Sequence, residues 1–331
     1  MRRVTSKDVA KAAGVSQTTV SFVLNGKHLE SISEATRRLV LATADELGYI
    51  PSAAARSLRT GRSDVVLCLI PDWPVTDAMS RLKLALSDRL ADAGVACVYF
   101  YYKGQVQTLS ALWRNLQPSL VIAFGAIDET EAHAMRGAGI PFLNGLFDIP
   151  GGPSSPQYIS QESIGRTQIE HLAERGHRHI AYAGIGDDRE DVFALPRIRG
   201  AEQACRDLGL PRPDVVAIEP DRAAAGRALD RWRGMPKPVT AVAAFNDVIA
   251  AAVLAAAWDR GVDVPGGLAV IGVDDLALAR LTSPPLTTVT IDLDTAARHL
   301  CDHALTVMGI AEARPAPDSG TALRIVRRAS S

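Results

Sequence analysis

The chain has 331 residues, of which 47% are hydrophobic and 22% are charged, and its formal net charge at pH 7 is −1. This is the composition of an ordinary globular protein, and the length predicts two or three domains, not one core. The sequence shows no apolar signal segment and no run of about 18 apolar residues, so we expect neither a secreted nor a membrane-spanning protein. The four cysteines are far apart and form no CxxC pair, which favours free thiols in a reducing cytoplasm and argues against a disulfide framework.

Residues 4–25 predict two short helices joined by a tight turn. Thr5 is a good N-cap for the first helix, and Gly14 can end it in the left-handed conformation. Ser16 is a second N-cap, and the outer side of the following helix carries Gln17, Thr18, Ser21 and Phe22. Polar side chains at the start of a second helix, after a turn with glycine, are typical of a helix-turn-helix that reaches base edges. A plain helical hairpin that only packs against the rest of the protein is the alternative.

The charge distribution favours the DNA-binding interpretation. Residues 1–63 contain ten Lys and Arg against five Asp and Glu, so this head carries +5. The remaining residues contain 26 basic and 32 acidic side chains and carry −6. A basic head on an acidic body suggests that the head alone has a nucleic-acid partner.

A third helix and a linker complete the head. Ser33 is expected to cap a helix that runs to about Leu47, with Leu39, Ala42 and Leu47 on its inner side. Residues 51–63 then form either a plain linker or a hinge that contains a short helix near residues 53–59. In the second interpretation, Leu58 enters the minor groove of DNA and wedges a base step apart.

Several motifs of the head match one family. They are Asp8-Val9-Ala10, Ala13-Gly14-Val15-Ser16, Thr19-Val20-Ser21, Leu47-Gly48-Tyr49 and Arg56-Ser57-Leu58. With these motifs the head resembles the lac repressor (LacI/GalR) family of bacterial transcription regulators. One departure is Phe22, where the family most often has an arginine that would read guanine. We expect DNA contacts from Thr5, Ser16, Gln17, Thr18, Thr19, Ser21, Phe22, Asn25, Ala55, Leu58 and Arg59.

From residue 64 onward the pattern changes to alternating strands and helices. A first α/β lobe is predicted over about 64–159, and a Pro/Gly-rich break at 149–156 precedes a second lobe over about 160–285. The tail, with a strand at 286–291 and a helix at 294–308, is expected to cross back to the first lobe. The predicted fold is thus an all-α helix-turn-helix head of residues 1–50, a hinge of residues 51–63, and a two-lobed α/β effector and dimerisation domain of residues 64–331 with parallel sheets. The two-lobed part resembles periplasmic sugar-binding proteins.

Candidate ligand residues follow the predicted strands, because open α/β sheets bind ligands beyond the carboxyl ends of their strands. They are Asp72, Trp73, Asp148, Asn246 and Asp274, together with Arg197, which is expected to open a helix. The family resemblance implies that Arg197, Asn246 and Asp274 contact a small-molecule effector. Two alternatives stay open: Asn246 caps the next helix, and Trp73 anchors a loop. The family usually has Asp-Asn where this chain has Ser160-Gln161, so contacts near that point are expected to differ.

Two classes of function compete on this evidence. An α/β enzyme needs a nucleophile and base or a metal set, and none is readable; His177 and His179 lack further ligands at suitable spacing. A solute-binding protein needs a signal segment and no basic head. We therefore expect a non-enzymatic, ligand-responsive repressor without cofactor or catalytic residues, cytoplasmic and nucleoid-associated in a bacterium. It would bind a pseudo-palindromic operator in double-stranded DNA as a homodimer, and a sugar-like effector would switch it. A tetramer stays open, although the tail lacks leucine heptads.

Overall fold

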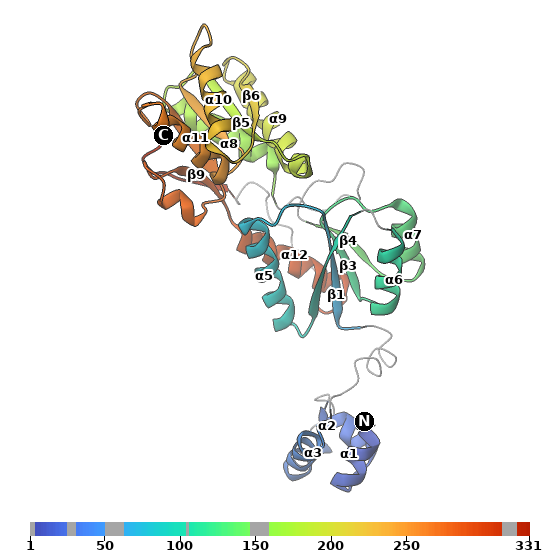
Figure 1. The fold of residues 1–331 in the computed structure, drawn as a ribbon. Coiled ribbons are helices and arrows are strands. Elements are labelled where there is room, and N and C mark those ends of the chain that lie inside the picture. The colour runs from blue at the N-terminus through green and yellow to red at the C-terminus, as the bar shows by residue number, and fades with distance from the viewer. Residues whose placement is uncertain (1–3, 25–30, 50–62, 104–105, 146–158, 313–322) are drawn as a thin grey trace. The chain divides into compact units, whose positions relative to one another are not determined.

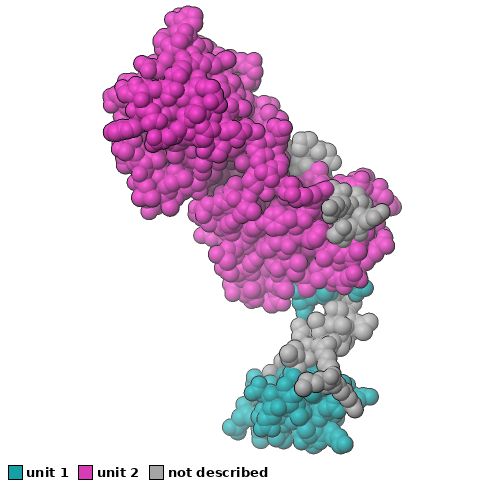
Figure 2. Space-filling view, viewed as in Figure 1, with its two compact units in different colours: residues 1–64, 117–119 teal, residues 65–116, 120–331 magenta. Residues whose placement is uncertain are grey.

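The structure is a computed structural model that describes residues 4–24, 31–49, 63–103, 106–145, 159–312 and 323–331. The chain divides into two compact units, residues 1–64 with 117–119 and residues 65–116 with 120–331. Figure 2 colours them separately, and each is described by itself. In the described residues no helix is long and apolar enough to cross a membrane.

Three helices form the head: α1 (Ser6–Ala13), α2 (Gln17–Leu24) and α3 (Glu34–Glu46). The predicted caps are present. The backbone N–H of Thr5 donates to the Asp8 carboxylate at 2.8 Å, and Ser16 Oγ accepts from the backbone N–H of Thr19 at 3.0 Å. Gly14 has φ 65°, the left-handed conformation that a sharp helix end requires. These local contacts explain why the turn between α1 and α2 could be read from the sequence.

The predicted inner face of α3 is wrong. Leu39 and Leu47 are exposed, whereas Val40 and Ala44 are buried and pack with apolar side chains of α1 and α2. Val40 and Ala44 are four residues apart and therefore share one face of the helix. Large apolar residues on both sides of this helix made its phase ambiguous in the sequence. The predicted short helix near residues 53–59 lies outside the described residues.

The first lobe contains a parallel sheet of β1 (Val65–Pro71), β2 (Ala96–Tyr102), β3 (Leu120–Ala123) and β4 (Phe142–Asn144) in the order β2-β1-β3-β4. Its helices are α5 (Asp77–Asp92), α6 (Val106–Leu116) and α7 (Glu129–Gly137). Successive side chains of a strand point to opposite faces, so β1 divides the core. Cys68 and Ile70 pack with apolar side chains of α5, and Leu67 and Leu69 pack with those of α6 and α7. Figure 1 shows α5 on one side of this sheet and α6 and α7 on the other. All four cysteines are free thiols.

The second lobe contains a six-stranded sheet in the order β10-β9-β8-β7-β5-β6. The strands are β5 (Ile180–Ile185), β6 (Asp214–Ile218), β7 (Ala241–Ala244), β8 (Ala269–Val273), β9 (Thr287–Ile291) and β10 (Leu323–Val326). All neighbours are parallel except β9 and β10. The helices of this lobe are α8 (Gln161–Glu174), α9 (Asp191–Asp207), α10 (Arg222–Arg233) and α11 (Asp247–Asp259), with short 3-10 turns η2 (Asp188–Glu190) and η3 (Ala277–Arg280). The last helix, α12 (Leu293–Val307), follows β9.

Two features of this lobe correct the sequence analysis. The predicted limit of the lobe near residue 285 falls between β8 and β9, but the two strands are hydrogen-bonded neighbours in one sheet. The chain crosses to the first lobe only afterwards, where α12 packs against α5. The strand β6 and the helix α10 were not assigned from the sequence. In the edge strand β6, Val215 and Ala217 are exposed and only Ile218 is buried, so the strand gives a weak apolar signal.

Helices α8 and α9 approach each other through two glycines. A Cβ on Gly165 would lie 2.8 Å from the carbonyl carbon of Arg197, and a Cβ on Gly200 would lie 2.6 Å from the carbonyl carbon of Glu162. Real side chains do not come this close to backbone atoms. The two glycines therefore permit the backbone contact that fixes the position of α9, the helix that carries Arg197.

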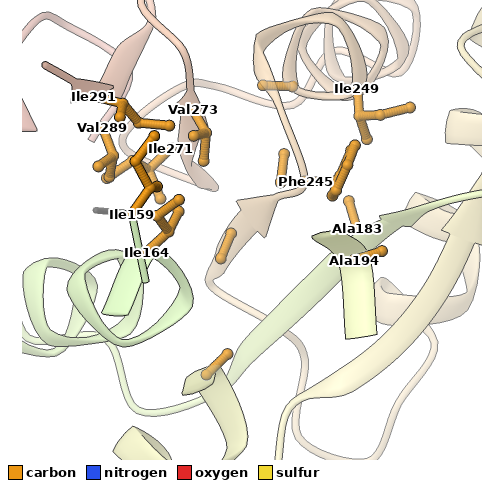
Figure 3. Packing of buried hydrophobic residues seen from close by; sticks show 14 of the residues in the cluster. Ile159, Ile164, Ala183, Ala194, Phe245, Ile249, Ile271, Val273, Val289 and Ile291 are labelled. Atoms are coloured by element: carbon orange, nitrogen blue, oxygen red, sulfur yellow. The ribbon is translucent and has the colours of Figure 1, made fainter. Parts of the chain in front are cut away.

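Buried aliphatic side chains fill the space around the start of α8 and the ends of the second sheet. Figure 3 shows Ile159 and Ile164 facing Ile271 and Val289, while Phe245 lies between Ile249 and Ala183. Because Phe245 follows β7 directly, this packing holds the end of that strand in place. The residues that come after β7 and β8 are thus supported by a rigid core.

Candidate functional site

The outer side of α2 presents polar side chains at the beginning of the helix. Ser16, Gln17 and Thr18 are exposed, and Val20 and Val23 on the opposite side are buried in the head. Gln17 donates a hydrogen bond from its side-chain nitrogen to Ser6 Oγ at 2.9 Å, which links the two helices of the motif. Thr5 is exposed, Thr19, Ser21 and Phe22 are half-buried, and the predicted contacts Asn25, Ala55, Leu58 and Arg59 lie outside the described residues.

This surface suits nucleic acid. Short polar side chains and the backbone N–H groups at a helix N-terminus can donate to phosphate oxygens and base edges. Phe22 is half-buried and its side chain has no hydrogen-bond donor, so a base contact there, as predicted from the sequence, would be apolar.

A second candidate site is a cavity of about 640 Å³, open space included, within the second unit. The first lobe contributes Trp73 after β1 and apolar residues of α5. The second lobe contributes polar residues that follow its strands, and Ile291 and Leu293 line the cavity where the chain passes from β9 to α12. The cavity therefore touches both lobes and the segment that connects them.

Arg197 is the cation of the cavity and is 6% exposed. Its Nε donates to Gln161 Oε1 at 2.8 Å, its Nη1 donates to the carbonyl oxygen of Phe245 at 2.6 Å, and its guanidinium lies 4.6 Å from the centre of the Phe245 ring. Gln161 belongs to the Ser160-Gln161 pair that departs from the family pattern, and its side-chain oxygen accepts a hydrogen bond from the arginine and so helps to orient it. A guanidinium held by three contacts is preorganised to bind a ligand with its remaining N–H groups.

The predicted position of Arg197 in its helix is wrong. The sequence analysis placed it at a helix start, but α9 begins at Asp191 and contains Pro196 in its interior. A proline inside a helix lacks the N–H that would bond to the carbonyl four residues earlier, so Pro196 is a weak position in the helical pattern of the sequence. Here the helix continues past it, and Arg197 lies in the second turn.

Two carboxylates line the cavity beside Arg197. Asp274 follows β8, is half-buried, and has φ 102°, an uncommon backbone conformation for a residue other than glycine. Glu190 ends η2 and is 7% exposed. Burial raises the pKa of both carboxylates, and the positive charge of Arg197 opposes that rise in both.

Asn246 caps the next helix, as one of the two alternatives predicted, and it lies at the cavity. Its side-chain oxygen accepts from the backbone N–H of Ile249 at 3.0 Å and so caps α11. The following Asp247 is fully buried. It accepts from Thr288 Oγ1 at 2.6 Å and from the backbone N–H of Leu276 at 2.7 Å. Asp247 therefore ties β9 and the loop after Asp274 to the start of α11.

Aromatic side chains form one wall of the cavity. Trp73 and Phe193 meet edge to face, with ring centres 4.8 Å apart and planes at 64°, and both line the cavity. Asp72, the neighbour of Trp73, does not line it and pairs with Lys103 at 3.0 Å. The last predicted cavity residue, Asp148, lies outside the described residues. The sequence analysis missed Glu190, Phe193 and Gln161.

Comparisons with known proteins agree with this architecture. Residues 5–52 match the model of bacterial regulatory proteins of the lacI family, and residues 169–331 match that of a periplasmic binding protein-like domain. The chain is 32% identical over 299 residues to the HTH-type transcriptional regulator DegA of Bacillus subtilis (strain 168), covering 87% of this chain and 86% of DegA. The chain belongs to the lacI family of bacterial regulatory proteins. It is a transcription regulator with a DNA-binding helix-turn-helix, and not an enzyme.

Other relatives match almost the full length. The HTH-type transcriptional regulator GalR of Escherichia coli (strain K12) is 29% identical, covering 95% of this chain and 91% of GalR. Among solved structures, the lac repressor dimer bound to operator and the anti-inducer ONPF has a TM-score of 0.78 at 25% identity, with 99% of both chains covered. The CelR–cellobiose complex, at 24% identity and a TM-score of 0.65, shares the fold. The lacI-family assignment therefore extends over the head and both lobes.

Proposed function

We propose that this lacI-family regulator is a homodimeric repressor that binds a pseudo-palindromic operator and is switched by a small polar effector in the cavity around Arg197. The observation that carries the proposal is the buried, oriented Arg197 facing a cavity lined from both lobes, in a chain that begins with a helix-turn-helix. Hydroxyl groups can bond to the guanidinium, Asn246 and Asp274, while a sugar face can lie on Trp73. A related structure is a complex with cellobiose, which supports a sugar-like effector.

The proposed switch works through one conformational equilibrium. An effector that touches Trp73 on one lobe and Arg197 on the other has different contacts when the lobes change their relative position, so it stabilises one arrangement over the other. Its effect on operator affinity cannot exceed this difference in binding free energy. The proposed hinge, with Leu58 as its minor-groove wedge, concerns residues outside the described part of the chain.

Operator binding tests the proposal for the head. Selection from a random DNA pool, followed by footprinting of the selected sequence, is expected to give a site with two-fold symmetry, because a two-fold dimer presents two recognition helices. Affinity should fall by roughly 10³-fold between about 50 and 200 mM salt if the dimer neutralises several phosphates. A duplex of scrambled sequence serves as the control. A protected site without symmetry would contradict the dimeric model.

Arg197→Ala tests the proposal for the cavity. The variant should bind the operator as the wild type does but respond at least tenfold more weakly to a ligand that a thermal-shift screen identifies, because ligand groups bonded to the guanidinium lose their partner. The measurement is operator affinity across a titration of that ligand. Arg199→Ala is the matched control, since Arg199 lies on the same helix, is exposed and pairs with Glu162. An unchanged response in Arg197→Ala would place the effector elsewhere, and circular dichroism checks the fold of both variants.

A further inference from the structure

The helix α9 directs three functional side chains to one side. Glu190 precedes the first residue of the helix, Phe193 follows three positions later and Arg197 seven positions later, and all three line the cavity. Residues at this spacing lie on a single helical face. Glu190 is placed by the turn before it, where the Asp187 carboxylate accepts from the backbone N–H of Arg189 at 3.0 Å. The carboxylate of Glu190 itself forms no cap for α9.

Glu190 has low exposure as a residue, but its carboxylate oxygens are not enclosed by protein and lie at the cavity. The residue is 7% exposed, and its carboxylate has no hydrogen-bond partner or ion pair within the ranges that the structure describes. Arg189, its neighbour, is held by Asp187 with contacts of 2.6 to 3.2 Å and points its charge there. A carboxylate that lines a cavity and has no donor from the protein can accept hydrogen bonds from a ligand in that cavity.

Acidic side chains outnumber basic ones among the described residues that line the cavity. Glu190 and Asp274 are the acids and Arg197 is the base among the described residues that line it. Arg197 already donates to two neutral acceptors, Gln161 and the carbonyl oxygen of Phe245, so part of its hydrogen-bonding capacity is committed. An anionic group beside Glu190 would meet two carboxylates in a medium that screens charge poorly, whereas a hydroxyl or ammonium group would be a donor to them.

We infer that Glu190 determines the charge class of the effector. The cavity accepts a molecule that presents hydrogen-bond donors, hydroxyl or ammonium, to Glu190 and rests an apolar face on Trp73 and Phe193, and it rejects phosphorylated and carboxylated metabolites. This inference rests on the proposed effector role of the cavity. Glu190 would thus be a specificity residue that selects the effector by its charge, with a carboxylate that does not cap α9.

The first test needs no ligand. If Glu190 serves binding and not folding, Glu190→Gln should unfold at an equal or higher temperature than the wild type at pH 7.5, because the amide removes a partly buried charge without changing shape. Asp188→Asn, an exposed acid two residues away, is the matched control for the loss of one negative charge. A marked drop in the unfolding temperature of Glu190→Gln, absent in Asp188→Asn, would show that the carboxylate is structural and would overturn the inference.

The second test uses matched probes on the full chain. The probes are compared by thermal shift and then by calorimetric titration. The first set is glucose with its amine and phosphate forms, glucosamine and glucose 6-phosphate. The second is adenosine with adenosine monophosphate, and cellobiose is added as a neutral disaccharide. We expect the neutral and cationic probes to stabilise the wild type and the phosphorylated probes not to. In Glu190→Gln, the preference for the amine over the phosphate probe should fall at least tenfold. Tightest binding of a phosphorylated member to the wild type overturns the inference but leaves the effector role intact. Stabilisation that persists unchanged in Arg197→Ala, or no stabilisation by any probe class, counts against the cavity as the effector site itself.

Discussion

Gly200→Ala is expected to destabilise the second lobe by about 3 kcal/mol, the upper part of the range for an overpacked core. The added Cβ would overlap the carbonyl oxygen of Glu162 and lie 2.6 Å from its carbonyl carbon. Both atoms belong to the backbone of α8, which cannot turn aside as a flexible side chain can. The helices must separate, and separation opens the core beneath them, where Ile164 and Ala201 are fully buried.

The measurement is the free energy of unfolding from urea titration followed by circular dichroism, with Gly137→Ala as the control. Gly137 ends α7 on the surface, and a Cβ there would have no heavy atom within 4 Å, so that variant should stay within about 1 kcal/mol of the wild type. Equal stabilities of Gly200→Ala and Gly137→Ala would mean that α8 and α9 do not pack through their backbones. The close approach of α8 and α9 also brings Gly165 against the backbone carbonyl group of Arg197, so it helps to fix the position of Arg197 relative to the cavity.

The features that could be predicted from the sequence are those with local causes. The turn of the helix-turn-helix follows from Thr5, Gly14 and Ser16, which act on backbone groups within a few residues. The parallel sheet of the first lobe follows from buried strand runs separated by helices. Asp274 and Asn246 were found because a strand end is visible in the sequence, and both line the cavity.

The missed features depend on contacts between distant segments. Glu190 and Phe193 looked like loop residues because Pro196 hid the early start of α9. Gln161 appeared only as a departure from a family pattern, and its role became clear from its bond to Arg197, 36 positions away. Whether Val40 or Leu39 faces the core is decided by α1 and α2, and the sheet that β9 joins is decided by pairing with β8.

Asp247 is expected to make the stability of the fold depend on pH. Burial raises the pKa of Asp247 to about 7 from an ordinary value of 3.8. The hydrogen bonds that Thr288 and Leu276 donate to the carboxylate lower the pKa and offset part of this rise. Below pH 3.8 the carboxyl group is protonated in both the folded and the unfolded state. Between pH 3.8 and about 7 only the unfolded state loses its proton, so the folded state binds more protons and the free energy of unfolding falls as pH rises. Above about pH 7 both states are ionised and this contribution stays lost.

We therefore expect the wild type to lose stability on going from pH 4.5 to pH 7.5 relative to Asp247→Asn, by about 1.4 kcal/mol per pH unit at most. The amide cannot ionise, so the difference between the two unfolding curves reports the titration of Asp247 together with its effect on the neighbouring Asp274. Asp188→Asn should keep the wild-type slope. A stability difference between the wild type and Asp247→Asn that does not change with pH would mean that Asp247 is ionised throughout. If the difference does change with pH as expected, Asp247 is protonated up to about pH 7 while it remains hydrogen-bonded to Thr288 and Leu276. Because these links hold the loop that follows Asp274, a neutral Asp247 would keep the cavity wall in place without adding a third negative charge behind it.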